Sequence, residues 1–195
     1  MFSRAVGSIS LIEGAANFNV TNVLEKPFEV RAGDVAIIAR GTNFTVRRYR
    51  DEDNVVVNVK EGTVEVRFGE TIRSVPTGMS LLVAKDGAMS VPSAEQLQEA
   101  VTWVDGNVTI SGRSLRYVLP QMKRWYGLDI KVPDTKLLDR NVFLSAPIDS
   151  KTAAIASVER SGGVKFSYIG ANMAFQDTTP TAKPATKTKT GTKRR

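Results

Sequence analysis

The spacing of apolar residues divides the chain into a strand-rich first half and a mixed second half. Over the first ninety residues, β-branched and aromatic residues either form short runs, as at 55–59, or alternate with polar residues, as at 63–68. Glycine turns separate these runs, and Glu61-Gly62 predicts a tight turn between two of them. Short strands at such spacing are typical of a β-sandwich or barrel. We therefore expect an all-β, sandwich-like domain over residues 1–92.

The period of the apolar pattern changes after Pro92. Ser93 is followed three residues later by Gln96, which fits a capping box at a helix start. Apolar residues then recur at helical spacing until Asp105-Gly106, where glycine can take the left-handed conformation that ends a helix. This pattern predicts a linking helix over residues 93–106.

Strand and helix patterns alternate over residues 107–177. The strands are expected at 107–110, 128–132, 142–145, 164–169 and 172–175. One helix is expected at 114–126, with a kink or a late start because of Pro120. A second helix is expected from Asp149 or Ser150 to about residue 160. The order describes a small α+β domain of βαββαβ type.

The net charge of +7 is concentrated at the C-terminal end of the chain. Six of the 27 basic residues and no acidic residue follow position 177, which leaves 21 basic against 20 acidic residues elsewhere. Residues 178–195 also lack large apolar side chains, so we expect a disordered tail there. A nearly neutral folded part gives no reason to expect nucleic-acid binding.

The composition excludes several kinds of chemistry. The chain has no cysteine and no histidine, which removes disulfides, Ser-His and Cys-His catalysis and the usual zinc sites. We see no spacing for a calcium loop and no cofactor motif, so neither a metal nor a cofactor is expected, and a metabolic enzyme is disfavoured. No signal peptide and no membrane-spanning run is visible in the sequence.

Two blocks of sequence resemble the FecR-type sensor proteins, the periplasmic parts of bacterial anti-sigma regulators. The first block is Leu11-Ile12-Glu13-Gly14-Ala15-Ala16-Asn17-Phe18-Asn19-Val20, then Pro27-Phe28-Glu29-Val30, then Gly41-Thr42-Asn43-Phe44-Thr45-Val46. The turn Lys60-Glu61-Gly62-Thr63-Val64-Glu65-Val66 matches the hairpin that follows in the family. The second block is Trp103-Val104-Asp105-Gly106, then Leu115, then Trp125-Tyr126-Gly127-Leu128-Asp129-Ile130. The second block is similar to the C-terminal domain of the same regulators, which resembles the secretin/TonB short N-terminal domain.

The resemblance implies a role in cell-surface signalling. The protein would be periplasmic and would relay a signal from an outer-membrane TonB-dependent transducer to an extracytoplasmic-function sigma factor, often for iron uptake. Its C-terminal domain would bind the transducer's signalling domain. Family members begin with a cytoplasmic sigma-binding segment, a membrane helix and further strands, so the β-domain is expected to be incomplete at its N-terminus. A sigma factor would be contacted only through that cytoplasmic segment.

The Gly41-Thr42 step is the candidate chemical site, because some members of the family cleave their own backbone there. Self-cleavage by an N-to-O acyl shift needs a hydroxyl beside the scissile carbonyl, which Thr42 supplies, and Asn43 could polarise that carbonyl. Neither step needs histidine. The alternative is that Gly41 only serves a bulge between strands. The protein is otherwise not expected to be an enzyme.

Two other groups of residues invite a functional interpretation. Trp125 and Tyr126 could form a partner-binding patch, or they could pack against the small sheet. Trp103 is expected in the core, on the apolar side of the linking helix. The basic run 47–50 is followed at once by the acidic run 51–53, which predicts a solvated hairpin tip.

Two further functions stay open on the sequence. The same fold could serve as an envelope scaffold or secretin-associated module without a signalling role. The basic tail could bind nucleic acid, which would make binding strongly salt-dependent.

Overall fold

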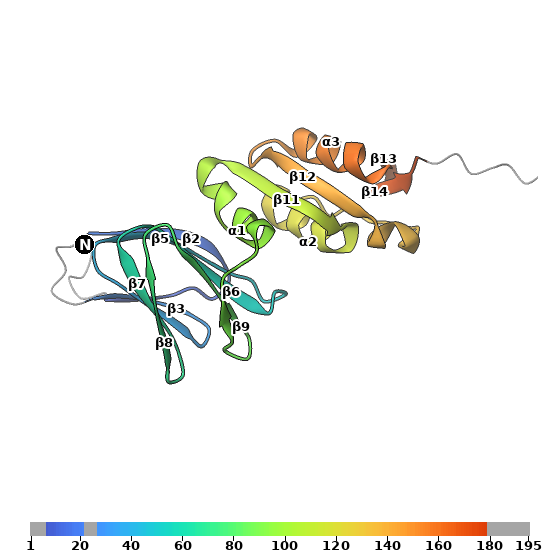
Figure 1. The fold of residues 1–195 in the computed structure, drawn as a ribbon. Helices are drawn as coiled ribbons and strands as arrows, with labels where there is room; N and C mark the ends of the chain where they lie inside the picture. The colour runs from blue at the N-terminus through green and yellow to red at the C-terminus, as the bar shows by residue number, and fades with distance from the viewer. Residues whose placement is uncertain (1–6, 22–26, 179–195) are drawn as a thin grey trace, which may run out of the picture.

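The computed structural model describes residues 7–21 and 27–178. They form a β-sandwich, a short helical connection and a small α+β domain, arranged in that order along the chain (Figure 1). This is the fold class expected from the sequence. The predicted disordered tail lies outside the described residues, except for Thr178. Within the described part of the chain, no helix is both long and apolar enough to cross a membrane.

Two five-stranded sheets make up the sandwich. The first has the strand order β1 (Ser8–Ser10), β3 (Phe28–Ala32), β4 (Val35–Ala39), β7 (Thr63–Phe68) and β8 (Thr71–Pro76). The second has the order β10 (Met89–Ser90), β9 (Ser80–Ala84), β6 (Asn54–Glu61), β5 (Thr42–Arg48) and β2 (Gly14–Val20). All neighbouring strands are antiparallel except β1 and β3, which are parallel.

The inward-facing residues of the two sheets form one apolar core. Phe44, Ile37 and Val57 are fully buried in it, and Phe18 stacks on Phe44 with ring centroids 5.2 Å apart. Alternation along β4 and β7 supplies the buried side chains of the first sheet. The alternation of apolar and polar residues in the sequence therefore places one face of each of these strands in the core between the two sheets.

The Glu61-Gly62 turn does not form the hairpin that the sequence suggested. β6 pairs with β5 and β9, whereas β7 pairs with β4 and β8, so the turn carries the chain from one sheet to the other. The prediction of a tight turn is confirmed, because Gly62 has a φ of 86° and joins two consecutive strands directly. The predicted pairing of the two strands was wrong.

The connection between the domains is α1 (Ala94–Val101) followed by the 3₁₀ turn η1 (Thr102–Asp105). Ser93 and Gln96 form the expected capping box, and Gly106 ends the segment with a φ of 80°. Ala100 of α1 packs on Val56 and Leu82, which face outward from the second sheet. This contact explains why Val55, Val56 and Val57 are apolar without alternation, since both faces of β6 are covered there.

The C-terminal domain has one apolar core of its own. Its elements are β11 (Asn107–Ser114), α2 (Leu115–Tyr126), the 3₁₀ turn η2 (Thr135–Asp139), β12 (Asn141–Pro147), α3 (Lys151–Gly162), β13 (Val164–Ile169) and β14 (Asn172–Asp177). β11 pairs with β12 and β13 with β14, both antiparallel. α2 contributes Leu115, Val118 and Met122 to the core, and Ser150 caps α3 as expected.

The predicted strand at 128–132 is reduced to a single bridge. Lys131 pairs in parallel with Ala174 of β14, through the Lys131 amide to the Met173 carbonyl and the Phe175 amide to the Lys131 carbonyl. Leu128 and Ile130 are buried at alternate positions, so the segment has the alternating burial of a strand although it pairs at only one residue. Pro133 follows two residues after Lys131 and supplies no backbone donor, which limits how far this pairing can extend.

Candidate functional site

Gly41 and Thr42 lie at a corner of the sandwich. β4 ends at Ala39 in the first sheet and β5 begins at Thr42 in the second, so the chain changes sheets at this step. Gly41 has a φ of 57°, a left-handed conformation that glycine adopts without strain. The alternative that Gly41 serves a strand bulge does not fit, because the nearby register shift falls between Asn43 and Phe44 of β5.

A second corner packs directly against the first. The Thr42 side chain is 1% exposed, and its hydroxyl lies 3.0 Å from the Arg40 carbonyl oxygen and 3.1 Å from that of Thr63. A Cβ atom at Gly62 would stand 2.8 Å from the Gly41 carbonyl oxygen. The absence of a side chain at Gly62 is therefore what lets the two sheet-to-sheet connections touch.

These contacts define what chemistry the corner can support. The Thr42 hydroxyl is on the residue whose amide nitrogen is bonded to the Gly41 carbonyl carbon, and it lies within hydrogen-bond distance of the Arg40 and Thr63 carbonyl oxygens. The Asn43 Oδ1 atom is buried without a hydrogen-bond partner. An oxygen can only accept, so polarising a carbonyl would fall to the Asn43 amide nitrogen.

The structure places the predicted aromatic pair in two different environments. Tyr126 is 4% exposed within the C-terminal core, and its hydroxyl donates to the Ala146 carbonyl at 3.1 Å. Burial is the main cause that raises the pKa of Tyr126 to about 12. Trp125 is half-buried and stacks on Trp103, with ring centroids 6.2 Å apart. A partner could therefore reach Trp125 more readily than Tyr126.

The run from Arg47 to Asp53 is not the solvated hairpin tip that its charge suggested. Arg47 is 4% exposed, and its guanidinium bonds both carboxylate oxygens of Glu52, with 3.1 Å between Nε and Oε2. Its Nη1 atom also donates to the Glu99 carbonyl oxygen of α1 at 2.7 Å. Burial lowers the pKa of Arg47, but the bonds and charge of Glu52 outweigh it and the pKa is raised overall. The predicted tip is instead part of the domain junction.

Residues of α2 complete this junction from the C-terminal domain. Gln121 donates to Glu52 Oε1 at 3.1 Å, and the Arg124 guanidinium donates to Asp51 at 2.7 Å. The same guanidinium lies over the ring of Tyr49, 3.6 Å from its centroid. Sequence reasoning missed these residues because about seventy positions separate the two halves. The only signal available was a polar Gln121 on the apolar face of α2.

The Glu99 side chain anchors a second part of the junction. Its carboxylate accepts from Arg113 Nε at 3.1 Å and from the Tyr117 hydroxyl at 2.7 Å. Burial and then the charge of Glu99 raise the pKa of Tyr117 well above its usual value, so the hydroxyl remains a donor. A cavity of about 220 Å³ lies between these groups and the residues 51–54. Its charged lining is already paired: Arg47 with Glu52, Asp53 with Lys85, Glu99 with Arg113 and Asp51 with Arg124.

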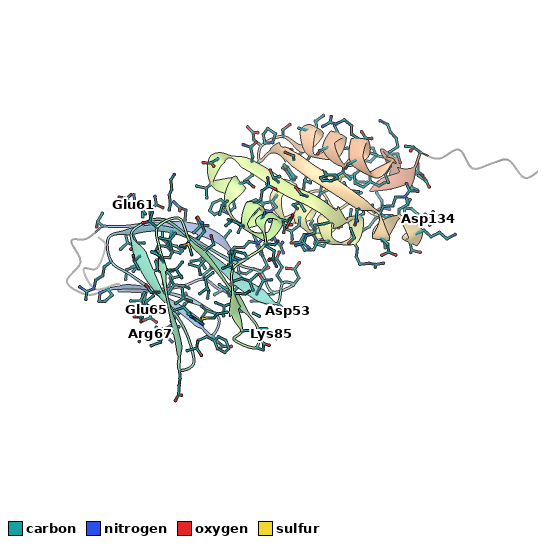
Figure 2. All side chains as sticks on the ribbon, in the orientation of Figure 1. Asp53, Glu61, Glu65, Arg67, Lys85 and Asp134 are labelled. Atoms are coloured by element: carbon teal, nitrogen blue, oxygen red, sulfur yellow. The ribbon has the colours of Figure 1, made fainter. Side chains whose placement is uncertain are left out.

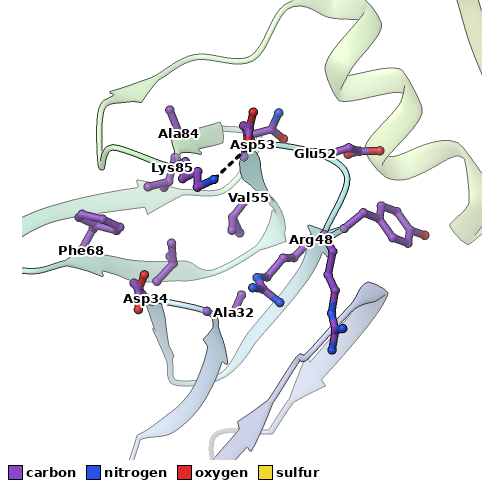
Figure 3. A pocket seen from close by; sticks show the side chains of 15 residues that line it. Ala32, Asp34, Arg48, Glu52, Asp53, Val55, Phe68, Ala84 and Lys85 are labelled. Atoms are coloured by element: carbon purple, nitrogen blue, oxygen red, sulfur yellow. Dashed lines mark ion pairs between the residues drawn. The ribbon is translucent and has the colours of Figure 1, made fainter. Parts of the chain in front are cut away.

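Another recess opens at the end of the sandwich beside the junction. It measures about 190 Å³ and is lined by the β3–β4 turn and by the ends of β5, β6 and β9 (Figure 3). Asp53 and Lys85 pair across its rim at 3.6 Å, with both side chains more than four-fifths exposed. Figure 3 shows the Glu52 carboxylate turned away from Arg48 and Lys85, toward the helices. The recess shares Glu52, Asp53 and Asn54 with the junction cavity but is otherwise lined by the sandwich.

Comparison with known proteins identifies the first domain. The family model described as FecR protein matches residues 2–65, which include both the Gly41-Thr42 corner and the Arg47–Glu52 pair. This chain carries a FecR domain. The FecR-type resemblance found in the sequence is therefore confirmed. No curated protein matches the chain.

Solved structures extend the likeness of this FecR-type protein to its second domain. Two crystal structures, each of a proposed anti-sigma factor from Parabacteroides distasonis ATCC 8503, match it with a TM-score of 0.68. One is 21% identical and covers 88% of this chain and 81% of its own. The other is 22% identical and covers 85% and 78%. At these identities the match establishes the fold, including the succession of the two domains.

Proposed function

We propose that this protein is a sensor component of a sigma-regulatory system in the bacterial envelope. It would act in the periplasm and receive a signal from an outer-membrane TonB-dependent transducer, often one for iron uptake. The observation that carries the proposal is one chain in which a FecR domain precedes a small α+β domain, as in the proposed anti-sigma factors of the same fold. In this proposal the two described domains receive the signal from the transducer. The sigma factor is contacted by the cytoplasmic segment that is found in the family.

An open strand edge supports transducer binding by the C-terminal domain. β13 pairs only with β14 among the described strands, and on its other edge the Phe166 amide donates to the Glu159 carboxylate of α3 at 2.8 Å, so the edge is open beyond Phe166 rather than along its whole length. At this edge Tyr168 is 68% exposed and Ile169 43% exposed, and Tyr168 packs edge-on against Phe166. A partner strand could pair there and bury both side chains. The other outer edge, at β12, is covered, because Ser157 and Ser161 of α3 bond the amides of Ser145 and Phe143.

Substitution of Tyr168 by aspartate is expected to weaken capture of a transducer signalling domain about tenfold, because exposed aromatic residues carry much of an interface's binding energy. The matched control is Phe143→Asp, which changes an aromatic residue of similar exposure beside the covered edge. Affinity purification with immobilised signalling domains measures both. No capture by the unchanged protein, or capture of a secretin subunit instead, would favour the scaffold function.

We also propose a single self-cleavage at the Gly41-Thr42 corner. The Thr42 hydroxyl oxygen would add to the Gly41 carbonyl carbon, the C–N bond would break, and the hydroxyl proton would pass to the released amine. One water molecule would then hydrolyse the ester, giving a carboxylate at Gly41 and restoring the hydroxyl. The burial of Thr42 and the left-handed Gly41 support this proposal by holding the reacting groups in one geometry.

The expected products are two fragments separated after Gly41, which intact-mass spectrometry of the purified protein detects over days. Thr42→Ala removes the nucleophile and is expected to abolish them. Thr45→Ala is the matched control, because Thr45 is also buried in β5 but bonds Asn17 instead of the corner. Self-cleavage is wrong if the unchanged protein stays as intact as the Thr42→Ala variant.

A further inference from the structure

The two domains share very little apolar surface. The sandwich core and the C-terminal core have no residue in common. Between them lies a small cluster in which Ala100 of α1 packs against Val56 and Leu82. Apart from the stack of Trp103 in η1 on Trp125 of α2, the rest of the junction is made of charged and polar side chains. The relative orientation of the domains therefore depends on a few polar contacts, and a junction of this kind can change its geometry.

One group of these contacts connects α2 to the β5–β6 connection, and we call it the latch. It consists of Gln121 and Arg124 on α2, with Tyr49, Asp51 and Glu52 on the sandwich. Arg124 makes three of the four contacts, through Asp51 at 2.7 Å, the Tyr49 ring at 3.6 Å and Glu52 at 3.8 Å. All three side chains of the sandwich lie in one short loop, so the latch is one localised contact.

The strongest ion pair near the latch lies entirely within the sandwich. Arg47 lies near the end of β5 and Glu52 in the loop that follows it, so both belong to the sandwich and stay paired whatever the position of α2. Separation of α2 would expose this pair to water without leaving either charge buried alone. Asp51 and Arg124 are already 48% and 19% exposed in their side chains, so water can replace their bond. Opening the latch therefore avoids the main cost of breaking a buried ionic junction.

A second group of contacts would hold the domains together while the latch opens. Glu99 of α1 bonds Arg113 and Tyr117 through its carboxylate and Arg47 through its carbonyl. Arg113 lies near the end of β11 and Tyr117 in the first turn of α2, whereas Gln121 and Arg124 lie one to two turns further along that helix. α1 itself stays packed on the second sheet through Ala100. The arrangement provides a pivot at Glu99 and a detachable contact at Arg124.

We propose that the Arg124 latch fixes the orientation of the C-terminal domain on the sandwich and opens by pivoting about α1, with both domains remaining folded. The device is a two-state element built from one local contact. It is independent of which partner the protein binds. Binding of a partner to one domain could thereby change the orientation of the other domain.

The test is the distance distribution between two spin labels, one on each domain. The chain has no native cysteine, so labels can be placed at Glu70→Cys in the β7–β8 turn and Lys136→Cys in η2, both exposed positions. The otherwise unchanged protein is expected to show one narrow distribution. Arg124→Glu places a negative charge against Asp51 and Glu52 and is expected to shift the closed-to-open ratio about tenfold toward open.

Two further variants decide the outcome. Asp51→Arg breaks the same contact from the sandwich side and is expected to open the latch as well. Arg116→Glu, on the same helix but paired with exposed Asp139, is expected to leave the distribution unchanged. Circular dichroism checks that each variant is folded. If Arg124→Glu does not fold, the distance distribution of Asp51→Arg tests the proposal in its place. The proposal is overturned if the folded latch variants keep the narrow distribution, or if Arg116→Glu broadens it equally.

Discussion

Replacing Glu52 with alanine is expected to lower the free energy of unfolding by about 3 kcal/mol, because it leaves the Arg47 guanidinium buried without its counter-charge. The side chains of Arg47 and Glu52 are only 5% and 10% exposed, so water cannot compensate the lost carboxylate. The Glu99 carbonyl would be the remaining acceptor for Arg47. Gln121 would also lose its acceptor. The change should lower the urea midpoint of the sandwich transition.

The matched control for this loss is Glu65→Ala. Glu65 pairs with Arg67 on the outward face of β7, and the two side chains are 39% and 48% exposed (Figure 2). A solvent-exposed pair of this kind contributes about 0–1 kcal/mol. Urea unfolding of both variants, followed by circular dichroism, compares the two pairs directly. Equal losses for Glu52→Ala and Glu65→Ala would mean that the junction pair is not a buried, stabilising interaction.

Gly62→Ala is expected to destabilise the sandwich by about 3 kcal/mol, since it combines backbone strain with a clash against backbone atoms. Gly62 has a φ of 86°, and its new Cβ would lie 2.8 Å from the Gly41 oxygen and 3.1 Å from the Thr42 Cα. Neither atom belongs to a flexible side chain that could move away. Relief of the clash would have to separate the two sheet-to-sheet corners, which should also displace the Thr42 hydroxyl.

Gly78→Ala separates the clash from the backbone strain. Gly78 has a φ of 78° but no atom within 4 Å of its added Cβ, so only the strain of about 1 kcal/mol applies. Thermal unfolding followed by differential scanning calorimetry measures both variants. If the two substitutions cost the same, the close packing of the two corners would be refuted.

Local patterns in the sequence predicted local structure well. The Ser93–Gln96 capping box, the left-handed caps at Gly106 and Gly127, and the Ser150 cap are all present. Each depends on residues within one helical turn, so a single sequence contains the necessary information. The alternation of apolar residues likewise indicated which strand faces are buried in the sandwich.

Features that depend on distant partners were not visible in the sequence. The charged run 47–53 was interpreted as solvated because opposite charges follow each other closely, yet Gln121 and Arg124 cover it from far along the chain. The predicted strand at 128–132 was too long, because the number of residues that pair depends on how β14 lies beside the segment and not on the segment's own sequence. The connection at Gly62 was assigned to a hairpin because sequence does not show which sheet each strand joins.

We propose that this protein takes part in sigma-factor regulation. The most direct test measures transcription from a promoter that depends on the cognate sigma factor, with and without the inducing signal, in cells that have or lack this gene. We expect the response to the signal to be lost in the deletion strain and restored by the unchanged gene, but not by the Tyr168→Asp variant. An identical response in cells with and without the gene would contradict the account.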